Sequence, residues 1–352
     1  MKRFERIILC LLLGCSLLLS ACGAQAPAAE TPAPAAEATE APAAEAPSGE
    51  APVEEAAASP TVRILTLNGT TGFGMADLIS RTKAGETKLD YSIGVESDAS
   101  NVTAALVSGD CDIAALPTNA AAALYNKTKG QVQVLALNTR GVLYLVTDGK
   151  EKIESIADLN GKTVYAPAQN PSVIFSYLCK ANGVEVTIDN SYAQPAELNA
   201  AAAAGEVALA VLPEPMVTIA RSQNQNLSVA LDLTEEWDKV AEPGSLVQGC
   251  VVVRRDFAEA QSEALAQFLT DYEASIALLS ADPAAAAQKI EEAGIFAKAA
   301  VAEKALPRCN VCFITGEAMQ RQLSAFLEIM FETAPQSIGG QLPGDDFYRL
   351  LG

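Results

Sequence analysis

One nine-residue pattern occurs twice in the chain, as GDCDIAALP at residues 109–117 and as GEVALAVLP at residues 205–213. An alanine-rich stretch of helical character precedes each copy, and a helix and an apolar strand follow it, with VQVLALN at 132–138 and LSVALDL at 227–233. Each copy is therefore predicted to belong to a helix, strand, helix, strand unit. Short apolar strands and crossover helices occur throughout α/β proteins, which would explain a loose similarity. We favour the interpretation that the chain contains two related lobes.

Short apolar strands alternate with helices from residue 61 onward, and long helices dominate after Arg255. This pattern predicts an α/β fold with two mostly parallel sheets and a helical C-terminal block. Two crossing strands, near 141–148 and 248–253, would form a hinge between the lobes. The predicted division places the first lobe at 61–147, the second lobe at 148–247, and a return strand with the helical C-terminal part of the first lobe at 248–352.

The N-terminus has the pattern of a lipoprotein signal peptide, residues 1–22. A basic head precedes an apolar run that is shorter than the roughly 20 residues of a membrane span, so a retained transmembrane helix is the weaker alternative. The run ends in Leu19-Ser20-Ala21-Cys22, in which Cys22 is the predicted lipidation site. Residues 23–60 contain 16 Ala, 7 Pro and 7 Glu and are predicted to form a disordered tether. The folded body would then lie outside the cell membrane, anchored by lipid.

Composition excludes several classes of function. The chain has a net charge of −19, and residues 61–352 carry −14 of it, which argues against binding to nucleic acid or to anionic lipid. It contains no histidine, which removes imidazole-dependent catalytic triads and histidine-ligated metals. We therefore predict no catalytic residue, no metal and no cofactor.

The five cysteines after the signal do not form an even disulfide framework, and one pair, Cys309 and Cys312, has CxxC spacing. A redox CxxC would begin a helix, but NVCFIT is predicted to be extended, and a zinc site would need a second pair. We interpret both residues as buried or half-buried thiols, with an incidental disulfide as the alternative.

Polar residues follow the predicted strand ends, which is where ligands bind in open α/β sheets. If the lobes face each other, the ends of the two repeat copies should lie across a cleft. The candidate ligand-binding residues are Asn68, Thr70, Thr71 and Gly72 after the first strand; Thr118 and Asn119 after the first copy; Asn138, Thr139 and Gln248 beside the crossings; Gln169, Asn170 and Ser172 at a helix start in the second lobe; and Glu214 after the second copy.

Each candidate also has a structural explanation. The glycines at 68–74 would serve a plain strand-to-helix turn, 169–172 would cap a helix, and the residues beside the crossings would satisfy their own backbone. The carboxylate of Glu214 would be stabilised at a helix N-terminus. In a cleft Glu214 would repel nitrate or sulfonate and attract an amine or an N–H of a heterocycle. Arg140 would attract an anion if it points inward, so the charge of the ligand stays open.

Six segments in this order resemble the extracytoplasmic solute-binding lipoproteins of ABC importers, in the nitrate, sulfonate, taurine and thiamine-precursor superfamily. The resemblance covers essentially all of 61–352. The segments are VRILTLNGTTGFGMADLI, GDCDIAALPTNAAAALY, VQVLALNTRGVLYLV, SIADLNGKTVYAPAQNPS, GEVALAVLPEPMVT and VQGCVVVRRDF.

The resemblance implies a two-lobed, periplasmic-binding-protein-like (type II) fold that closes on a small molecule. It also implies delivery of that molecule to an ABC permease with its ATPase by a protein that is not an enzyme and is expected to be a monomer. An orphan receptor that presents its ligand to a signalling partner is an alternative. An enzyme of precursor biosynthesis is a weaker one, because such chemistry relies on histidine or cysteine clusters that this chain lacks.

Overall fold

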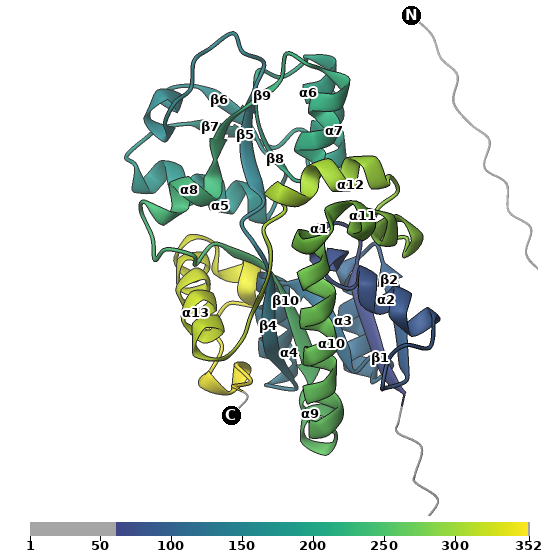
Figure 1. Cartoon of the computed structure of the whole chain (residues 1–352). Coiled ribbons are helices and arrows are strands. Elements are labelled where there is room, and N and C mark those ends of the chain that lie inside the picture. The colour runs from purple at the N-terminus through teal and green to yellow at the C-terminus, as the bar shows by residue number, and fades with distance from the viewer. Residues whose placement is uncertain (1–60, 351–352) are drawn as a thin grey trace, which may run out of the picture. The chain divides into compact units, whose positions relative to one another are not determined.

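The computed structural model describes residues 61–350. The predicted signal peptide, Cys22 and the tether therefore lie outside the described residues. Two sheets organise the described residues, and both belong to one compact unit. Figure 1 shows the first sheet in the lower part of the view and the second in the upper part.

The first sheet has six strands and defines the first lobe. Its neighbours β1, β2 and β3 pair in parallel, whereas β10 runs antiparallel between β3 and β4. In spatial order the strands are β11 (Val311–Ile314), β4 (Val132–Arg140), β10 (Val247–Arg254), β3 (Ile113–Pro117), β1 (Val62–Leu67) and β2 (Tyr91–Glu96).

The second sheet has five strands and defines the second lobe. Here β6 pairs in parallel with β7 and β8, and β5 runs antiparallel between β8 and β9. In spatial order the strands are β7 (Thr187–Asp189), β6 (Thr163–Tyr165), β8 (Leu209–Pro213), β5 (Leu143–Thr147) and β9 (Ser228–Asp232).

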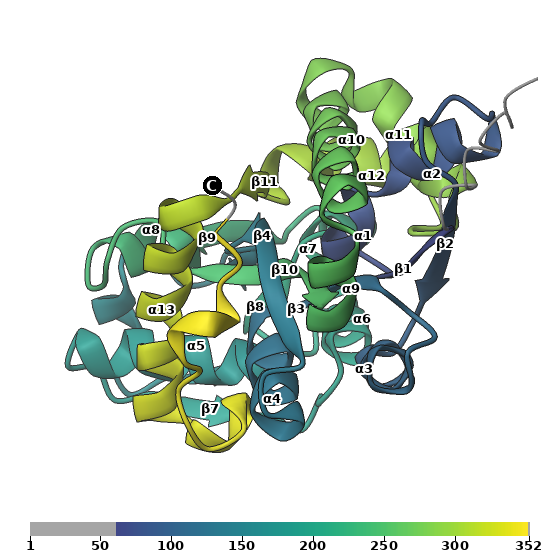
Figure 2. The same ribbon diagram turned by 90° about the horizontal axis from the view of Figure 1, so that it is seen from below.

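Helices cover both faces of each sheet, because successive strand residues point to opposite faces and both faces are apolar. On β3, for example, Ile113 packs with α10 and Ala114 with α3 and α4. Figure 2 shows α10 and α13 on opposite sides of β4 and β10. The α-helices are α1 (Thr70–Phe73), α2 (Ala76–Lys83), α3 (Ala99–Ser108), α4 (Thr118–Thr128), α5 (Asn170–Ala181), α6 (Pro195–Ala204), α7 (Met216–Gln223), α8 (Leu233–Asp238), α9 (Arg255–Ala260), α10 (Ser262–Ala281), α11 (Pro283–Glu292), α12 (Ala299–Ala305) and α13 (Gly316–Thr333).

Short 3₁₀ turns complete the connections. They are η1 (Ile156–Leu159), η2 (Leu306–Arg308), η3 (Pro335–Ile338) and η4 (Asp345–Phe347).

The two-lobed α/β prediction is confirmed, but the sheets are mixed rather than mostly parallel. The reason is that each sheet accepts one crossing strand that runs against its neighbours, β10 in the first and β5 in the second. In the first sheet the edge strand β11 also pairs antiparallel with β4. The strand Leu143–Thr147, which the predicted division assigned to the first lobe, pairs in the second sheet. The chain thus passes between the lobes at Gly141 and Val142.

The strand order explains why the chain contains the repeated pattern. The series β4, β10, β3, β1, β2 in the first sheet corresponds in order and direction to β9, β5, β8, β6, β7 in the second. Each copy follows a helix whose C-cap is its glycine in the left-handed region, Gly109 with φ 83° and Gly205 with φ 77°. Such a backbone favours glycine. The two copies therefore hold equivalent places in the two lobes.

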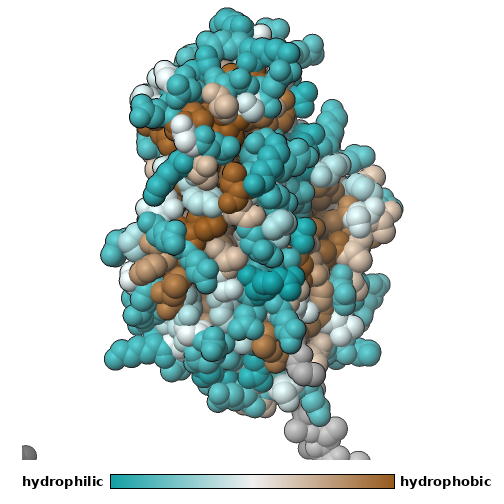
Figure 3. Space-filling view, turned by 90° about the vertical axis from the view of Figure 1, so that its left-hand side faces the viewer, coloured by the Kyte–Doolittle hydropathy of each residue, from teal (hydrophilic) through white to brown (hydrophobic). Residues whose placement is uncertain are grey.

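One face of the described residues is mostly polar, as expected of an acidic body (Figure 3). Figure 3 shows one face of the described residues, on which hydrophilic residues cover most of the area and hydrophobic ones form separate patches. Within residues 61–350, no helix combines the length and the apolar character needed to cross a membrane.

Candidate ligand-binding site

A pocket of about 320 Å³ lies between the two lobes. Its walls come from the starts of α3 and α4 in the first lobe and of α5 and α6 in the second. The lining residues are Ala99, Pro117, Asn119, Ala120, Ala168, Gln169, Asn170, Pro171, Ala193, Gln194 and Pro195.

Two amide side chains join the lobes at this pocket. Asn170 Nδ2 donates a hydrogen bond of 2.7 Å to Asn119 Oδ1. Asn119 in turn donates to the backbone oxygen of Ser337 at 3.3 Å, which fixes its orientation. The Oδ1 atom of Asn170 is buried and has no hydrogen-bond partner among the described residues. Buried acceptors usually have a partner, so this oxygen is an unsatisfied polar group at the contact between the lobes.

The four helices that start at the pocket are capped differently. Helix α3 carries the carboxylate of Asp98 at its N-cap, and α6 carries Glu197 in a capping box. The backbone amide of Ser100 holds the pKa of Asp98 below its ordinary value, so this carboxylate is ionised. By contrast, α4 and α5 have no acidic residue in the first turn and no side-chain cap. The positive ends of α4 and α5 are therefore left uncompensated beside the pocket.

Three of the predicted site residues line this pocket: Asn119, Gln169 and Asn170. Gln169 has a positive φ of 66° at the N-cap of α5, a conformation that few side-chain-bearing residues adopt. Ser172 lies just behind it and donates to the backbone oxygen of Pro167 at 2.8 Å. The neighbouring Thr118 is fully buried and donates to the backbone oxygen of Val247 at 2.8 Å.

The residues beside the crossings form hydrogen bonds within the protein. Asn138 is buried and donates to the backbone oxygen of Thr71 and to Tyr272 Oη, each at 3.1 Å. Thr139 donates to Asn138 Oδ1 at 3.1 Å. Gln248 Oε1 accepts from the backbone amide of Val142 at 2.8 Å, directly at the passage between the lobes.

The loop after β1 packs inside the first lobe. Gly69 donates to the backbone oxygen of Ile295, and Asn68 is exposed. A side chain at Gly72 would overlap the backbone carbonyl oxygen of Leu67, so close packing explains this glycine. Thr70 and Thr71 are half-buried on the short helix α1. None of these four predicted residues lines the interlobe pocket.

Glu214 lies at a second contact between the lobes. Its side chain is fully buried and accepts from Arg308 Nε at 2.6 Å. It also accepts from the backbone amide and the hydroxyl of Thr218, at 3.1 and 3.0 Å. Arg140, the other charged candidate, has a buried Nε atom with no partner among the described residues. The structure thus places Asn119 and Glu214 at separate interlobe contacts.

Sequence reasoning missed Gln194 and Arg308. The signal for Gln194 was available, since AQP at 193–195 repeats the glutamine before a helix start that marks AQNP at 168–171. Arg308 had no such signal, because its role depends on a contact with a residue 94 positions away.

The five cysteines among residues 61–350 are free thiols, and four of them are buried. Burial raises the pKa of Cys312 to about 12 and raises that of Cys309 as well. Cys312 lies on β11, so the extended prediction for NVCFIT is confirmed. Among residues 61–350 no group of three Cys, Asp or Glu side chains could hold a metal ion.

Larger hollows lie on the outside of the first lobe, one of about 650 Å³ along α3 and α4. None of the predicted site residues lines that hollow or the one beside it near Arg254. We take the interlobe pocket as the candidate site, because a ligand favours closure of the lobes only if it contacts residues of both.

Comparison with known proteins places this geometry in context. Residues 83–303 match the model of a family described as "ABC transporter, phosphonate, periplasmic substrate-binding protein". No curated protein sequence matches the chain.

Solved structures share the fold at low identity. An ABC transporter protein from Parabacteroides distasonis has 23% identity and a TM-score of 0.70, with 82% of this chain and 98% of that chain covered. The periplasmic aliphatic sulphonate binding protein SsuA from Escherichia coli has 15% identity and a TM-score of 0.64, with coverage of 84% and 98%. The alkanesulfonate-binding protein SsuA from Xanthomonas axonopodis pv. citri, bound to MOPS, has 16% identity and a TM-score of 0.59, with coverage of 79% and 94%.

Proposed function

The chain belongs to the family of periplasmic substrate-binding proteins of phosphonate ABC transporters, and from this premise we propose that its ligand is a small organic oxyanion, of the phosphonate or sulfonate class. As a member of this family the protein is the substrate-binding component of an ABC import system. The proposed binding site is the interlobe pocket, with the oxyanion between the starts of α4 and α5.

The uncapped N-termini of α4 and α5 carry this proposal. Each helix end has a partial positive charge of about half a unit and backbone amides that point outward. The other two helices at the pocket hold their own carboxylates at their starts, Asp98 as the N-cap of α3 and Glu197 in the first turn of α6. One positive end from each lobe thus remains available to an anion, and an anion that contacts both would favour the closed arrangement.

The lining of the pocket is consistent with a tetrahedral oxyanion. No charged side chain lines it, and the nearby carboxylates of Asp98 and Glu197 are engaged in capping hydrogen bonds to their own helices. The amides of Asn119, Gln169, Asn170 and Gln194 supply neutral donors and acceptors.

The position of Glu214 weakens the case for an amine. Its carboxylate is fully buried and already paired with Arg308 and Thr218. A cationic ligand would have to displace Arg308 to reach it. Two of the structural relatives bind sulfonates according to their names, which agrees with an anionic head group at this fold.

We also propose that the protein is lipid-anchored at Cys22 and that residues 23–60 tether the folded body beside its permease. The lipobox LSAC at 19–22 and the low-complexity composition of the following segment support this proposal. Both segments lie outside the described residues, so the support comes from the sequence pattern alone.

Titration calorimetry of the mature chain tests the ligand class. The panel comprises methylphosphonate, methanesulfonate, sulfate, methylammonium and a neutral amide, each at low and at physiological salt. We expect saturable binding of at least one oxyanion, weakened modestly by salt, and none of the cation. Binding of methylammonium with no oxyanion response would overturn the proposed ligand class.

A further inference from the structure

The segment from α12 to β11, residues 299–314, connects the lobes a third time. Before it, α11 packs against α2 and α10 in the first lobe. The helix α12 then lies against α7 of the second lobe, as Figure 1 shows on the right of the upper lobe. After η2 the chain returns, because β11 pairs with β4 in the first sheet. This connecting segment therefore contacts the second lobe without joining its sheet.

Three polar contacts fix the connecting segment to the second lobe, and all of them involve Arg308. Tyr144 Oη donates to the backbone oxygen of Arg308 at 2.8 Å. The guanidinium donates from Nε to Glu214 Oε1 at 2.6 Å and from Nη2 to Thr218 Oγ1 at 2.8 Å. Tyr144 lies on β5, Glu214 directly after β8, and Thr218 on α7. Arg308 therefore contacts three separate parts of the second lobe.

The burial of the pair makes this contact energetically important. The Glu214 side chain is 0% exposed and that of Arg308 is 33% exposed. A buried carboxylate that loses its only cationic partner keeps its desolvation cost, which makes breaking such a pair far more costly than breaking a surface pair. Movement of the lobes apart in this region would have to break the ion pair or detach the connecting segment from the first lobe.

From these contacts we infer that Arg308 and Glu214 form an interlobe ion pair that holds the lobes together in the absence of ligand. The contact uses only groups of the protein, so part of the free energy of closure is present before a ligand binds. The ligand then has to supply less of the free energy of closure. Its apparent affinity depends on the fraction of ligand-free molecules that are already closed, and the ion pair raises this fraction. This inference holds whatever the chemical class of the ligand.

A cross-linking experiment on the ligand-free chain tests the inference. Asn119→Cys and Asn170→Cys place two thiols at the other interlobe contact, away from Arg308, and a short bismaleimide joins them only when the lobes are together. We expect the five native thiols of residues 61–350 to react slowly, because burial raises the pKa of each of them. In this background we expect rapid cross-linking with the ion pair intact and at least tenfold slower cross-linking after Arg308→Met.

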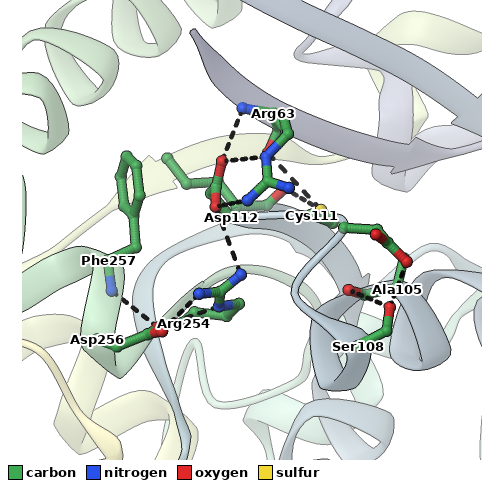
Figure 4. A network of polar contacts seen from close by, with 10 residues as sticks. Arg63, Ala105, Ser108, Cys111, Asp112, Arg254, Asp256 and Phe257 are labelled. Carbon is green, nitrogen blue, oxygen red and sulfur yellow. Dashed lines mark hydrogen bonds and ion pairs between the residues drawn. The ribbon is translucent and has the colours of Figure 1, made fainter. Parts of the chain in front are cut away.

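Arg63→Met is the matched control. Figure 4 shows Arg63 bound to Asp112, a carboxylate whose side chain is 4% exposed, within the first lobe. Asp112 also lies 3.6 Å from Arg254, so the control keeps a cation at the buried carboxylate. This variant removes an arginine from a buried acid without touching the lobe interface. It should leave the cross-linking rate unchanged.

The double variant Glu214→Gln with Arg308→Met covers the case in which Arg308→Met fails to fold. It removes both charges and leaves no buried ion, and it should also slow cross-linking at least tenfold. Equal rates in the parent and in either folded variant would overturn the inference. So would the absence of cross-linking in the parent, because the lobes would then be apart with the ion pair in place.

Discussion

The sharpest test of the proposed site is Asn170→Asp, which places a carboxylate at the start of α5 without changing the size of the side chain. Asn170 donates to Asn119 at 2.7 Å, and this donor would be lost. Asn119 can compensate by turning its own amide, at the expense of the 3.3 Å contact with Ser337. The helix dipole also favours an acid at this position. Thermal stability should therefore change little.

Ligand binding should change much more. A sphere with the volume of the pocket, about 320 Å³, has a radius of about 4 Å, so a central anion would lie about that far from the new carboxylate. Two like charges at 4 Å repel by about 4 kcal/mol at an effective dielectric constant of about 20. Because Asn170 is partly exposed, solvent screening reduces this to about 2 kcal/mol. The dissociation constant should rise by about thirtyfold.

The assay is calorimetry against the best oxyanion from the panel, with Gln223→Glu as control. Gln223 is exposed at the end of α7 and lines no pocket described here, so this variant adds the same charge elsewhere. The lost affinity should return as the pH falls below about 4, since a protonated Asp carries no charge and the bound anion raises its pKa further. Unchanged affinity in Asn170→Asp, or an equal loss in Gln223→Glu, would refute the site.

Three further predictions concern other parts of the chain. Gly72→Ala should lower the free energy of unfolding by about 2 kcal/mol or more, because the added carbon overlaps the backbone oxygen of Leu67. Gly69→Ala meets open space and should cost only about 1 kcal/mol, through its positive φ. Chemical denaturation of the two variants measures both free energies. Cys309→Ser with Cys312→Ser should leave ligand affinity unchanged in calorimetry, and a large loss would show that the pair contributes to binding. Cys22→Ala should abolish lipid attachment while the folded body keeps its melting temperature, and unchanged membrane fractionation would count against the lipobox.

The architecture could be predicted because it follows from local pattern. Alternation of apolar strands and helices is visible in the sequence between residue 61 and Arg255, and the glycines Gly109 and Gly205 mark two helix ends directly. The antiparallel insertion of β5 and β10 could not be seen this way, because the direction of a crossing strand depends on which sheet it enters. The same limitation shifted the first lobe boundary past β5.

The candidate site was predictable only in part, for the same reason. Asn119, Gln169 and Asn170 stand at strand ends or helix starts, where a polar residue is informative by position. Asn138 stands in a similar place, yet its amide binds Thr71 and Tyr272 within the first lobe. Sequence alone cannot distinguish a polar residue that faces the other lobe from one that bonds within its own lobe, because both occupy the same kind of position along the chain.

The two repeat copies end in equivalent prolines, Pro117 and Pro213, but the polar residues just after them, Asn119 and Glu214, are not equivalent in register and have different roles. After the first copy, α4 begins without an acidic cap, and Asn119 in its first turn faces the second lobe across the pocket. After the second copy, Glu214 accepts the backbone amide of Thr218 and so satisfies the start of α7 with a carboxylate. A carboxylate in place of Asn119 would neutralise the positive end of α4, which is the charge proposed to attract the anion. An amide in place of Glu214 would leave Arg308 without its counterion. We therefore expect Asn119→Glu to abolish oxyanion binding while the lobes remain together. Glu214→Gln should let the lobes separate while the uncapped starts of α4 and α5 stay intact.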